Sequence, residues 1–150
     1  MILMDDEQLI NLFRGKGFKV TVQRLAICKY VIGRDDHPSA EQIYQALKIN
    51  YPTISLGTIY KTLHLMQDMD IIQELGFKDG TVRYDPDMDL HINMVCTDCG
   101  TIHDYKPDNI NKLWEEMLLN LEIETNGQRI DLYYQCSECK KKKQMVLFDS

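Results

Sequence analysis

Ser55-Leu-Gly-Thr-Ile-Tyr60-Lys-Thr-Leu63-His-Leu-Met66 is the stretch that decides the fold of the first half of the chain. Ser55 can cap the first turn of a helix, and apolar side chains follow it near helical spacing. The side chains expected on the outward face are small, hydroxylated or basic: Ser55, Gly57, Thr58, Lys61, Thr62 and, at its margin, Leu65. Such a surface suits a helix that enters the major groove of DNA, and it suits a solvated helix of any helical domain equally well.

The segments on either side of this helix predict the rest of the motif. The expected elements are helices at residues 5–15 and 21–33, a helix that opens at the capping box of Ser39 and Gln42, and strands at 71–75 and 81–84. The turn signal Lys78-Asp79-Gly80 lies between the two strands. Three or four helices followed by a hairpin is the order of a winged helix-turn-helix, in which the last helix before the hairpin reads DNA.

The second half of the chain has a different pattern, typical of a small sheet with one helix. Strands are predicted at residues 92–95 and 101–104, and a second strand pair at 121–125 and 129–135 around Asn126-Gly127. Between the pairs, Asp108 can cap a helix with a clear apolar stripe: Ile110, Leu113, Trp114, Met117, Leu118 and Leu121. One helix leaves strand edges and a sheet face to bury, so we expect two copies of the chain to pair.

Charge divides the chain near the same place. Residues 1–84 hold ten acidic and ten basic side chains, whereas residues 85–150 hold thirteen acidic and seven basic ones and account for the net charge of −6. We therefore predict an α+β protein of two domains, with an N-terminal winged helix-turn-helix at 1–84 and a small α/β domain at 85–150. The hinge between them is expected at about residues 84–91.

Four of the five cysteines form two Cys-x-x-Cys pairs, Cys96 with Cys99 and Cys136 with Cys139. Each pair can offer two thiolate sulfurs from one tight turn, and two pairs complete the tetrahedron that structural Zn²⁺ prefers. Two unrelated pairs, or redox-active dithiols, are the alternatives. An odd number of cysteines makes a disulfide framework the weaker interpretation. The fifth cysteine, Cys28, lies on the apolar side of the second predicted helix and is expected to be buried.

Histidine and aspartate side chains mark a second candidate metal site. His37 lies in a loop beside two aspartates, His91 lies where the halves join, and Asp104 follows on a predicted strand. A mixed imidazole and carboxylate set suits a borderline divalent ion such as Fe²⁺ or Mn²⁺. From the residues alone, a set of surface side chains at a linker explains this pattern equally well.

Ordered segments along nearly the whole chain, roughly residues 8–143, resemble the ferric uptake regulator (Fur) family. The matching segments are Val20-Thr-Val-Gln-Arg24, His37-Pro-Ser-Ala-Glu-Gln-Ile-Tyr44, Ser55-Leu-Gly-Thr-Ile-Tyr60-Lys-Thr-Leu63, the stretch from His91 to Gly100, and Cys136-x-x-Cys139. The resemblance implies that residues 1–84 form a winged-helix DNA-binding domain. It also implies that residues 85–150 form an α/β dimerisation and metal-binding domain, which holds structural zinc on its four paired cysteines.

Within that family the chain is similar to the peroxide-sensing PerR branch, because aspartates rather than glutamates stand at positions 85 and 104. The resemblance implies that a regulatory Fe²⁺ or Mn²⁺ ion draws ligands from both domains: His37, Asp85, His91, residue 93 and Asp104. Residue 93 is Asn93, where the usual pattern has His, so this ligand becomes an amide oxygen. Asp87, Asp89 and His103 lie nearby in the sequence as alternative ligands.

The function implied by the resemblance is that of a metal-dependent, homodimeric transcriptional repressor on palindromic double-stranded DNA, in which peroxide oxidises a ligand histidine, His37 or His91, when iron is bound. The DNA contacts implied are Tyr60 on thymine methyl groups, Lys61 and Thr58 on the same helix, Lys16 near the minor groove, and Arg24 on a phosphate. The alternative is a metal-uptake regulator of the same family that responds to iron, manganese or zinc without sensing peroxide.

Other classes of protein fit the sequence poorly. No apolar run approaches the roughly 20 residues of a membrane helix, and acidic residues stand where a signal peptide has lysine, so we expect a cytoplasmic protein. A zinc-dependent hydrolase or deaminase needs an open coordination position and a His-x-Glu motif before a cysteine pair, whereas four cysteines close the site and the motif is missing. We therefore expect no enzyme activity and no organic cofactor.

Overall fold

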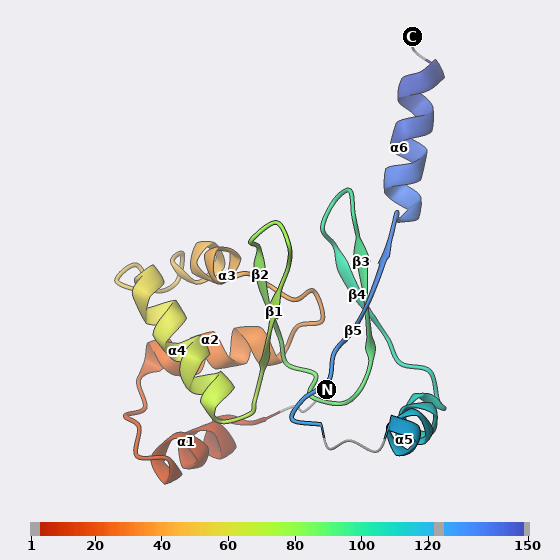
Figure 1. Cartoon of the computed structure of the whole chain (residues 1–150). Coiled ribbons are helices and arrows are strands. Elements are labelled where there is room, and N and C mark those ends of the chain that lie inside the picture. Colours follow the sequence, from red (N-terminus) through yellow and green to blue (C-terminus); the bar gives the residue numbers. More distant parts are fainter. Residues whose placement is uncertain (1–3, 122–124, 149–150) are drawn as a thin grey trace. The chain divides into compact units, whose positions relative to one another are not determined.

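The computed structural model describes residues 4–121 and 125–148 and divides into two compact units, unit 1 (residues 1–88) and unit 2 (residues 89–150). Figure 1 follows the chain from α1 near the N-terminus to α6 near the C-terminus. Within the described residues, unit 1 holds four helices and a hairpin, and unit 2 holds a three-stranded sheet and two helices. Among these same residues, no helix combines the length and the apolar character needed to span a membrane.

The helices of unit 1 are α1 (Asp6–Gly15), α2 (Val22–Ile32), α3 (Ala40–Leu47) and α4 (Leu56–Asp68). Each helix follows a side chain that accepts a hydrogen bond from its first turn: Asp5, Thr21, Ser39 and Ser55. Ser39 and Gln42 form the predicted capping box, in which each backbone N–H donates to the other side chain at 2.8 and 3.3 Å. Local sequence therefore sets where these helices begin.

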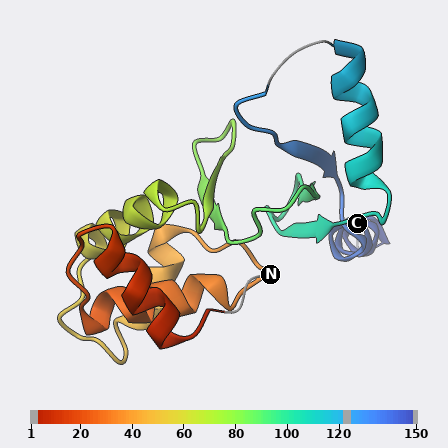
Figure 2. The ribbon, with the colours of Figure 1, turned by 90° about the horizontal axis from the view of Figure 1, so that it is seen from below.

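An apolar core holds the helices of unit 1 together. Helix α4 packs against α2 and α3, and α1 packs against α2; Figure 2 shows these helices gathered in one group. The side chains with no exposed surface include Leu9, Phe13, Ile27, Cys28, Val31, Ile43, Ile59, Leu63 and Met66. Burying one aliphatic or aromatic side chain of this size stabilises a fold by about 1.5–3 kcal/mol, so unit 1 has a substantial core of its own. Cys28 is buried in it, as expected.

The hairpin that completes unit 1 consists of β1 (Gln73–Gly76) and β2 (Val82–Asp85), which pair antiparallel. In the turn between them, Gly80 has a φ of +81°, and the carboxylate of Asp79 accepts the backbone N–H of Thr81 at 2.9 Å. Helices followed by this hairpin form a winged helix, and the predicted α+β fold class is confirmed.

Unit 2 contains a mixed sheet of β3 (Ile92–Cys96), β4 (Ile102–Tyr105) and β5 (Ile130–Tyr134), in the order β4-β3-β5. Strand β4 is antiparallel to β3, whereas β5 is parallel to it. The strand predicted at 129–135 is confirmed as β5, whereas its predicted partner at 121–125 lies mostly outside the described residues. Residue 121 ends α5 (Ile110–Leu121), residues 122–124 lie outside the described residues, and the described partner of β5 is β3. A parallel pair needs a long crossover connection, and α5 lies within it.

The two helices of unit 2 are largely exposed in the single chain. Along the predicted apolar stripe of α5, Leu113, Met117 and Leu121 are 55, 43 and 54% exposed, while Ile110 is buried. Helix α6 (Ser137–Phe148) was not predicted and includes the basic run Lys140–Lys143, which is exposed. An amphipathic helix that does not bury its apolar stripe within its own chain has that stripe available for a partner.

Candidate metal centres and nucleic-acid interface

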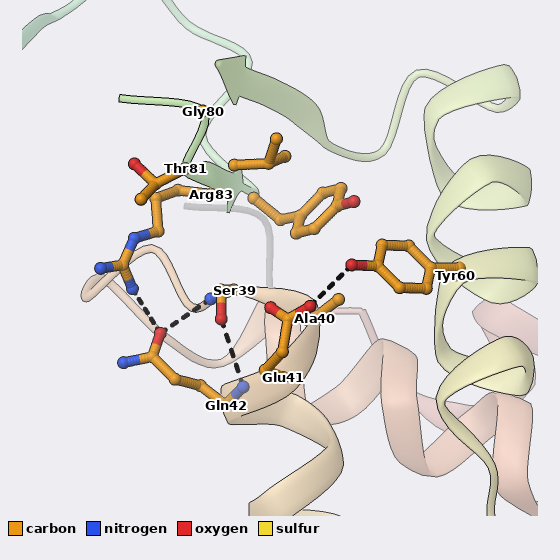
Figure 3. Close-up of a pocket in the computed structure, with 10 residues that line it drawn as sticks. Ser39, Ala40, Glu41, Gln42, Tyr60, Gly80, Thr81 and Arg83 are labelled. Carbon is orange, nitrogen blue, oxygen red and sulfur yellow. Dashed lines mark hydrogen bonds between the residues drawn. The ribbon is translucent and has the colours of Figure 1, made fainter. Parts of the chain in front are cut away.

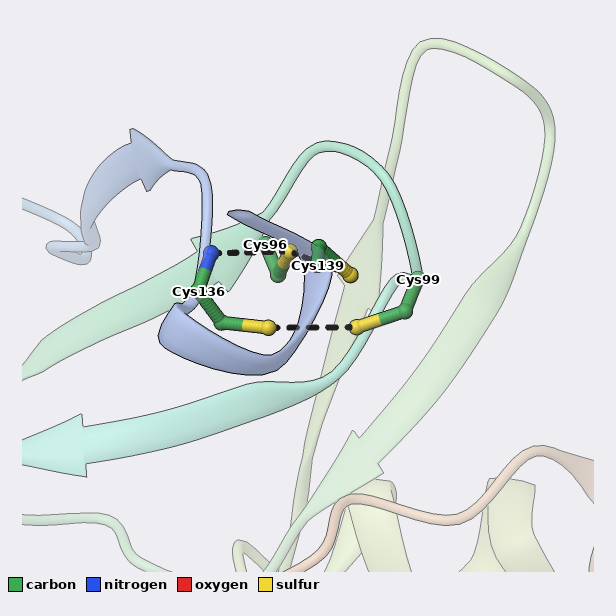
Figure 4. Close-up of side chains that lie close together, drawn as sticks. All are labelled: Cys96, Cys99, Cys136 and Cys139. Atoms are coloured by element: carbon green, nitrogen blue, oxygen red, sulfur yellow. Dashed lines mark hydrogen bonds between the residues drawn. The ribbon is translucent and has the colours of Figure 1, made fainter. Parts of the chain in front are cut away.

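The four paired cysteines come together in unit 2 (Figure 4). Cys96 ends β3, and Cys99 follows in a tight turn in which Gly100 has a φ of +70° and donates its N–H to the Cys96 carbonyl at 2.9 Å. Cys136 follows β5, and Cys139 lies in the first turn of α6. The parallel register of β3 and β5 places the two turns side by side, so the sheet builds the cluster.

The sulfur positions fit a tetrahedral zinc ion. The Sγ–Sγ distance is 3.9 Å between Cys96 and Cys139 and also 3.9 Å between Cys99 and Cys136, and all four atoms lie within 4.8 Å of one another. Zinc–sulfur bonds of about 2.3 Å give a tetrahedron with edges of about 3.8 Å. A disulfide requires sulfur atoms about 2.05 Å apart, and these cysteines are free thiols. The geometry favours a closed four-thiolate site over a redox dithiol.

Hydrogen bonds around the sulfurs stabilise negative charge on part of the cluster. The backbone N–H groups of Cys136, at 3.3 Å, and of Cys99 lower the pKa of the Cys96 thiol to about 6. A hydrogen bond to the Cys136 sulfur and the removal of water raise the pKa of Cys139 to about 12, because both favour the protonated thiol. A divalent cation at the centre of the cluster stabilises all four thiolates together and removes this difference.

In unit 1, His37 and Asp85 form a buried pair. His37 Nε2 lies 3.6 Å from Asp85 Oδ1, and both side chains are fully buried. The carboxylate of Asp85 is oriented by the backbone N–H of Asp87 at 2.7 Å and by the side-chain amide of Gln73 at 2.9 Å. His37 has a φ of +49°, in the left-handed region that is unfavourable for a residue other than glycine. Burial and fixed orientation set this pair apart from the solvated loop residues that the sequence pattern also allowed.

In unit 2, acceptor atoms of three side chains meet at the start of the sheet. His91 Nδ1 lies 2.7 Å from the carbonyl oxygen of Asp89, which can only accept, so Nδ1 carries a proton and Nε2 has a lone pair in the neutral ring. That nitrogen lies 3.3 Å from Asn93 Oδ1 and 3.6 Å from Asp104 Oδ1. One imidazole nitrogen facing two oxygens is a ligand set that suits Fe²⁺ or Mn²⁺.

The three alternative ligands lie in other environments. Asp87 contributes its backbone N–H to the buried pair of unit 1. The carboxylate of Asp89 is exposed and pairs with Lys106 at 2.7 Å, which lowers the pKa of Asp89. His103 stands one position before Asp104 on β4, so its side chain points to the opposite face of the sheet. Among Asn93 and its three alternatives, the side chain that faces His91 Nε2 is therefore that of Asn93.

Helix α4 carries three of the predicted DNA-contact residues. Lys61 and Tyr60 are exposed, while Thr58 is half-buried with its hydroxyl 2.9 Å from the Ser55 hydroxyl in the helix cap. Thr62, expected on the outward face, is fully buried and donates its hydroxyl to the Thr58 carbonyl at 2.8 Å. That expectation is wrong because packing against α2 and α3 turns Thr62 toward the core.

Sequence reasoning missed the partner of Tyr60. The Tyr60 hydroxyl donates to Glu41 Oε1 at 2.7 Å and so links α4 to α3 (Figure 3); this bond lowers the pKa of Glu41 and raises that of Tyr60. Beside it, Arg83 of β2 donates to Gln42 Oε1. These residues line a cavity of about 450 Å³ on α3, α4 and the hairpin. Glu41 directly precedes the capping-box residue Gln42, but no local pattern connects it with a residue nineteen positions later.

The remaining predicted DNA contacts lie elsewhere on unit 1. Lys16 is exposed directly after α1, where its backbone N–H donates to the Leu12 carbonyl at 3.2 Å. Arg24 lies in α2, is half-buried, and donates from its guanidinium to the Lys19 carbonyl. Arg24 is therefore engaged with the backbone in this structure, while the Lys16 side chain is solvated.

Comparisons with known proteins give a consistent result. The model of the ferric uptake regulator family matches residues 15–133. The chain is 34% identical over 136 residues to the peroxide-responsive repressor PerR of Staphylococcus aureus, covering 91% of this chain and 92% of that protein. It is similar to the Campylobacter jejuni peroxide stress regulator at 29% identity and a TM-score of 0.70, over 91% of this chain and 100% of the other. The Helicobacter pylori ferric uptake regulator Fur has a similar fold, with a TM-score of 0.77 at 20% identity over 89% and 90% of the chains.

Proposed function

Because this chain belongs to the ferric uptake regulator family of transcription regulators, we propose that it is a metal-dependent, dimeric repressor that senses peroxide through oxidation of a ligand histidine. The observation that carries the proposal is a His–Asp pair in each unit, His37 with Asp85 and His91 with Asp104. Residues 1–84 bind operator DNA in the cytoplasm, residues 85–150 dimerise and hold metal, and residues of about 84–91 form the hinge.

One regulatory Fe²⁺ or Mn²⁺ ion takes ligands from both pairs and from Asn93. Each pair alone offers one nitrogen and one carboxylate, whereas these ions prefer sets of about six ligands. The five side chains together supply two imidazoles, two carboxylates and an amide oxygen. An ion that binds residues of both units stabilises one arrangement of the chain over the others. In a dimer, that arrangement sets the spacing of the two α4 helices, which must match half-sites separated by about 34 Å or a multiple.

Zinc on the four paired cysteines is structural, because four thiolates leave no coordination position open. The apolar stripe of α5 contacts a second copy of the chain, which explains why Leu113, Met117 and Leu121 are exposed in one copy. A two-fold dimer presents two identical α4 helices and therefore reads a palindromic operator.

On the operator, α4 enters the major groove with Tyr60 against thymine methyl groups and with Lys61 and Thr58 beside it. Lys16 lies near the minor groove and Arg24 on a phosphate. Because the second half of the chain carries the net charge of −6, a bound divalent ion also reduces the electrostatic repulsion between the protein and DNA.

Sensing is a modification of the protein itself. One oxygen atom of hydrogen peroxide is inserted into a C–H bond of the His37 or His91 imidazole, and the other oxygen leaves as water. Bound Fe²⁺ supplies the one-electron redox chemistry for this reaction. An oxidised ring is a poorer lone-pair donor, so the ion is lost, the two units are no longer held, and the operator is released.

The test loads the zinc-replete protein with Fe²⁺ without oxygen, adds a small dose of peroxide, and measures the mass of the peptides that contain His37 and His91. We expect one added oxygen atom on either peptide with iron and none in a Mn²⁺-loaded control. His103, an exposed imidazole on the opposite face of the same sheet, is an internal control. Equal oxidation of His103 would point to unspecific damage and contradict sensing at this site.

A metal-uptake regulator of the same family is the second candidate function, and Asn93 is the observation that favours it. An amide oxygen in place of an imidazole removes one nitrogen ligand for Fe²⁺. Unmodified histidines together with metal-dependent operator binding would support this alternative. Operator binding that is independent of Fe²⁺ and Mn²⁺ would contradict both functions.

A further inference from the structure

Asn93 occupies the centre of a row of polar side chains across the sheet of unit 2. It stands on the central strand β3, directly opposite Asp104 on β4 and Asp131 on β5. Side chains at the same register position of neighbouring strands share one face of the sheet. Asn93 is only 2% exposed, so its amide must find its hydrogen-bond partners within this row and at the adjacent His91.

The partners fix which end of the amide faces which neighbour. Asn93 Nδ2 lies 3.2 Å from Asp131 Oδ1 and 3.4 Å from the carbonyl oxygen of Ile130. A carboxylate and a backbone carbonyl can only accept hydrogen bonds, so the group that faces them must be the NH₂ of the amide. The carbonyl oxygen of Asn93 is thereby directed at His91 Nε2, 3.3 Å away.

Asp131 is itself held in place. The guanidinium of Arg129 contacts both of its oxygens, with Nε 2.8 Å from Oδ1 and Nη2 2.7 Å from Oδ2. The Tyr133 hydroxyl donates to Oδ2 at 3.3 Å. A two-pronged contact between a guanidinium and a carboxylate restricts orientation as well as adding energy. A flipped Asn93 amide would set its oxygen against the Asp131 carboxylate, which disfavours that orientation.

We propose that Asp131 holds Asn93 as a neutral oxygen ligand, and that this arrangement shifts the preference of the regulatory site from Fe²⁺ toward Mn²⁺. The inference rests on the regulatory site proposed above and deepens it. Imidazole nitrogen favours Fe²⁺, which stands above Mn²⁺ in the order of affinities, whereas carbonyl and carboxylate oxygens suit Mn²⁺. Exchanging one nitrogen for one oxygen therefore costs Fe²⁺ more than it costs Mn²⁺. Asp131 acts through Asn93 and is a positioning residue.

The first test compares Asn93→His with the unchanged protein, as full-length, zinc-replete dimers. The Kd values for Fe²⁺ and Mn²⁺ are measured without oxygen by competition against a fluorescent chelator. We expect the substitution to tighten Fe²⁺ binding more than Mn²⁺ binding, so that the ratio of the two Kd values moves toward iron. An unchanged ratio in a folded variant would overturn the inference. Absence of any second metal in the unchanged protein would instead overturn the proposed function.

The second test concerns Asp131 and does not depend on how a new imidazole fits the sheet. Asp131→Leu removes the acceptor that holds the amide and is expected to weaken Mn²⁺ binding by about tenfold. Leu132→Ala changes the next residue of β5, whose exposed side chain points to the opposite face of the sheet, and is the matched control, with no expected change. In an Asn93→Ala background the Asp131→Leu effect should vanish, because no amide remains to be oriented. An equal effect in that background would show a merely structural role and overturn the assignment. Zinc content and circular dichroism report whether each variant is folded.

Discussion

The two units differ in how much apolar surface each buries by itself. Unit 1 encloses a core in which side chains such as Phe13, Ile59 and Leu63 have no exposed surface. The buried apolar side chains that the structure describes in unit 2 are Leu90, Val95, Cys96, Ile102 and Ile110. A unit of this size with so small a core usually needs a metal or a partner to be stable. Unit 1 is therefore held by packing, whereas the small core of unit 2 is expected to depend on zinc and on a second copy of the chain for stability.

The largest expected effect follows from removing zinc. Structural zinc sites contribute about 10–16 kcal/mol of apparent binding free energy at neutral pH, more than a core of this size can replace. In a Cys136→Ser variant, we expect the amides of β3, β4 and β5 to lose protection from hydrogen exchange while those of α2 and α4 keep it. Hydrogen exchange read by mass spectrometry on the full-length chain measures this.

A cysteine outside the cluster provides the control for that experiment. Cys28 is buried in the core of unit 1, and burial raises its pKa to about 12, so it remains an unreactive thiol at neutral pH. Cys28→Ala should leave zinc content and the protection of unit 2 unchanged. A sheet that stays protected after zinc is lost would contradict the view that zinc holds unit 2.

A substitution that removes packing from the core of unit 1 should destabilise unit 1 and leave unit 2 intact. Leu63→Ala removes a fully buried side chain from α4, and substitutions of this kind cost about 2–5 kcal/mol. We expect unit 1 to unfold at a lower urea concentration, as measured by hydrogen exchange of the amides in its helices. The zinc content should not change. If the amides of the unit 2 sheet lost protection from hydrogen exchange at the same urea concentration as those of α4, the two units would unfold as one cooperative structure. This result would contradict the view that the two units are stabilised separately.

Substitutions in the apolar stripe of α5 test separately whether unit 2 is also stabilised by dimer formation. Met117→Lys places a charge in the stripe and should convert the dimer to a monomer in analytical ultracentrifugation, because burying an unpaired ammonium group is unfavourable. Leu119→Lys is the matched control: Leu119 is 78% exposed and points about half a turn away from Met117. Equal dissociation by both variants would mean that the stripe is not the contact surface.

Features that depend on local sequence were predicted from the sequence, and features that depend on distant contacts were not. The capping residues Ser39 and Ser55 marked helix starts because their hydrogen bonds lie within one turn. The two cysteine pairs marked a metal cluster because each pair is itself local. The parallel pairing of β5 with β3 was missed, because it joins strands separated by α5 and the nearby Asn126-Gly127 signal favoured a hairpin.

The same distinction applies to the candidate site. Asn93 was recognised from its sequence position, but its orientation depends on Asp131, 38 residues away, and so could not be predicted. Thr62 was placed outward by helical spacing alone, whereas the phase of a helix is decided by the elements it packs against. The types of ligand can therefore be predicted from the sequence, whereas the residues that orient those ligands can be identified only from the folded structure.

The smallest expected effect concerns the surface of unit 1. Because the core stabilises this unit, surface substitutions should change DNA binding without changing stability. Glu41→Ala removes the acceptor of the Tyr60 hydroxyl and frees the ring from α3. Ordering the freed Tyr60 side chain again on DNA costs about 0.5–1 kcal/mol, so we expect the operator Kd to rise roughly two- to fivefold. Glu41→Gln keeps an acceptor and should recover most of the affinity. The unfolding midpoint and zinc content should be unchanged in both.

Replacing thymine by uracil in the operator distinguishes positioning of Tyr60 from a simple charge effect. If Glu41 orients the ring against thymine methyl groups, the unchanged protein should lose affinity for the uracil operator, and Glu41→Ala should lose less. Removing a carboxylate near DNA also reduces repulsion from phosphates, which strengthens binding to every sequence and flattens the dependence on salt. Tighter binding of Glu41→Ala to both operators, with the same difference between thymine and uracil, would therefore assign Glu41 to charge alone and leave Tyr60 independent of α3.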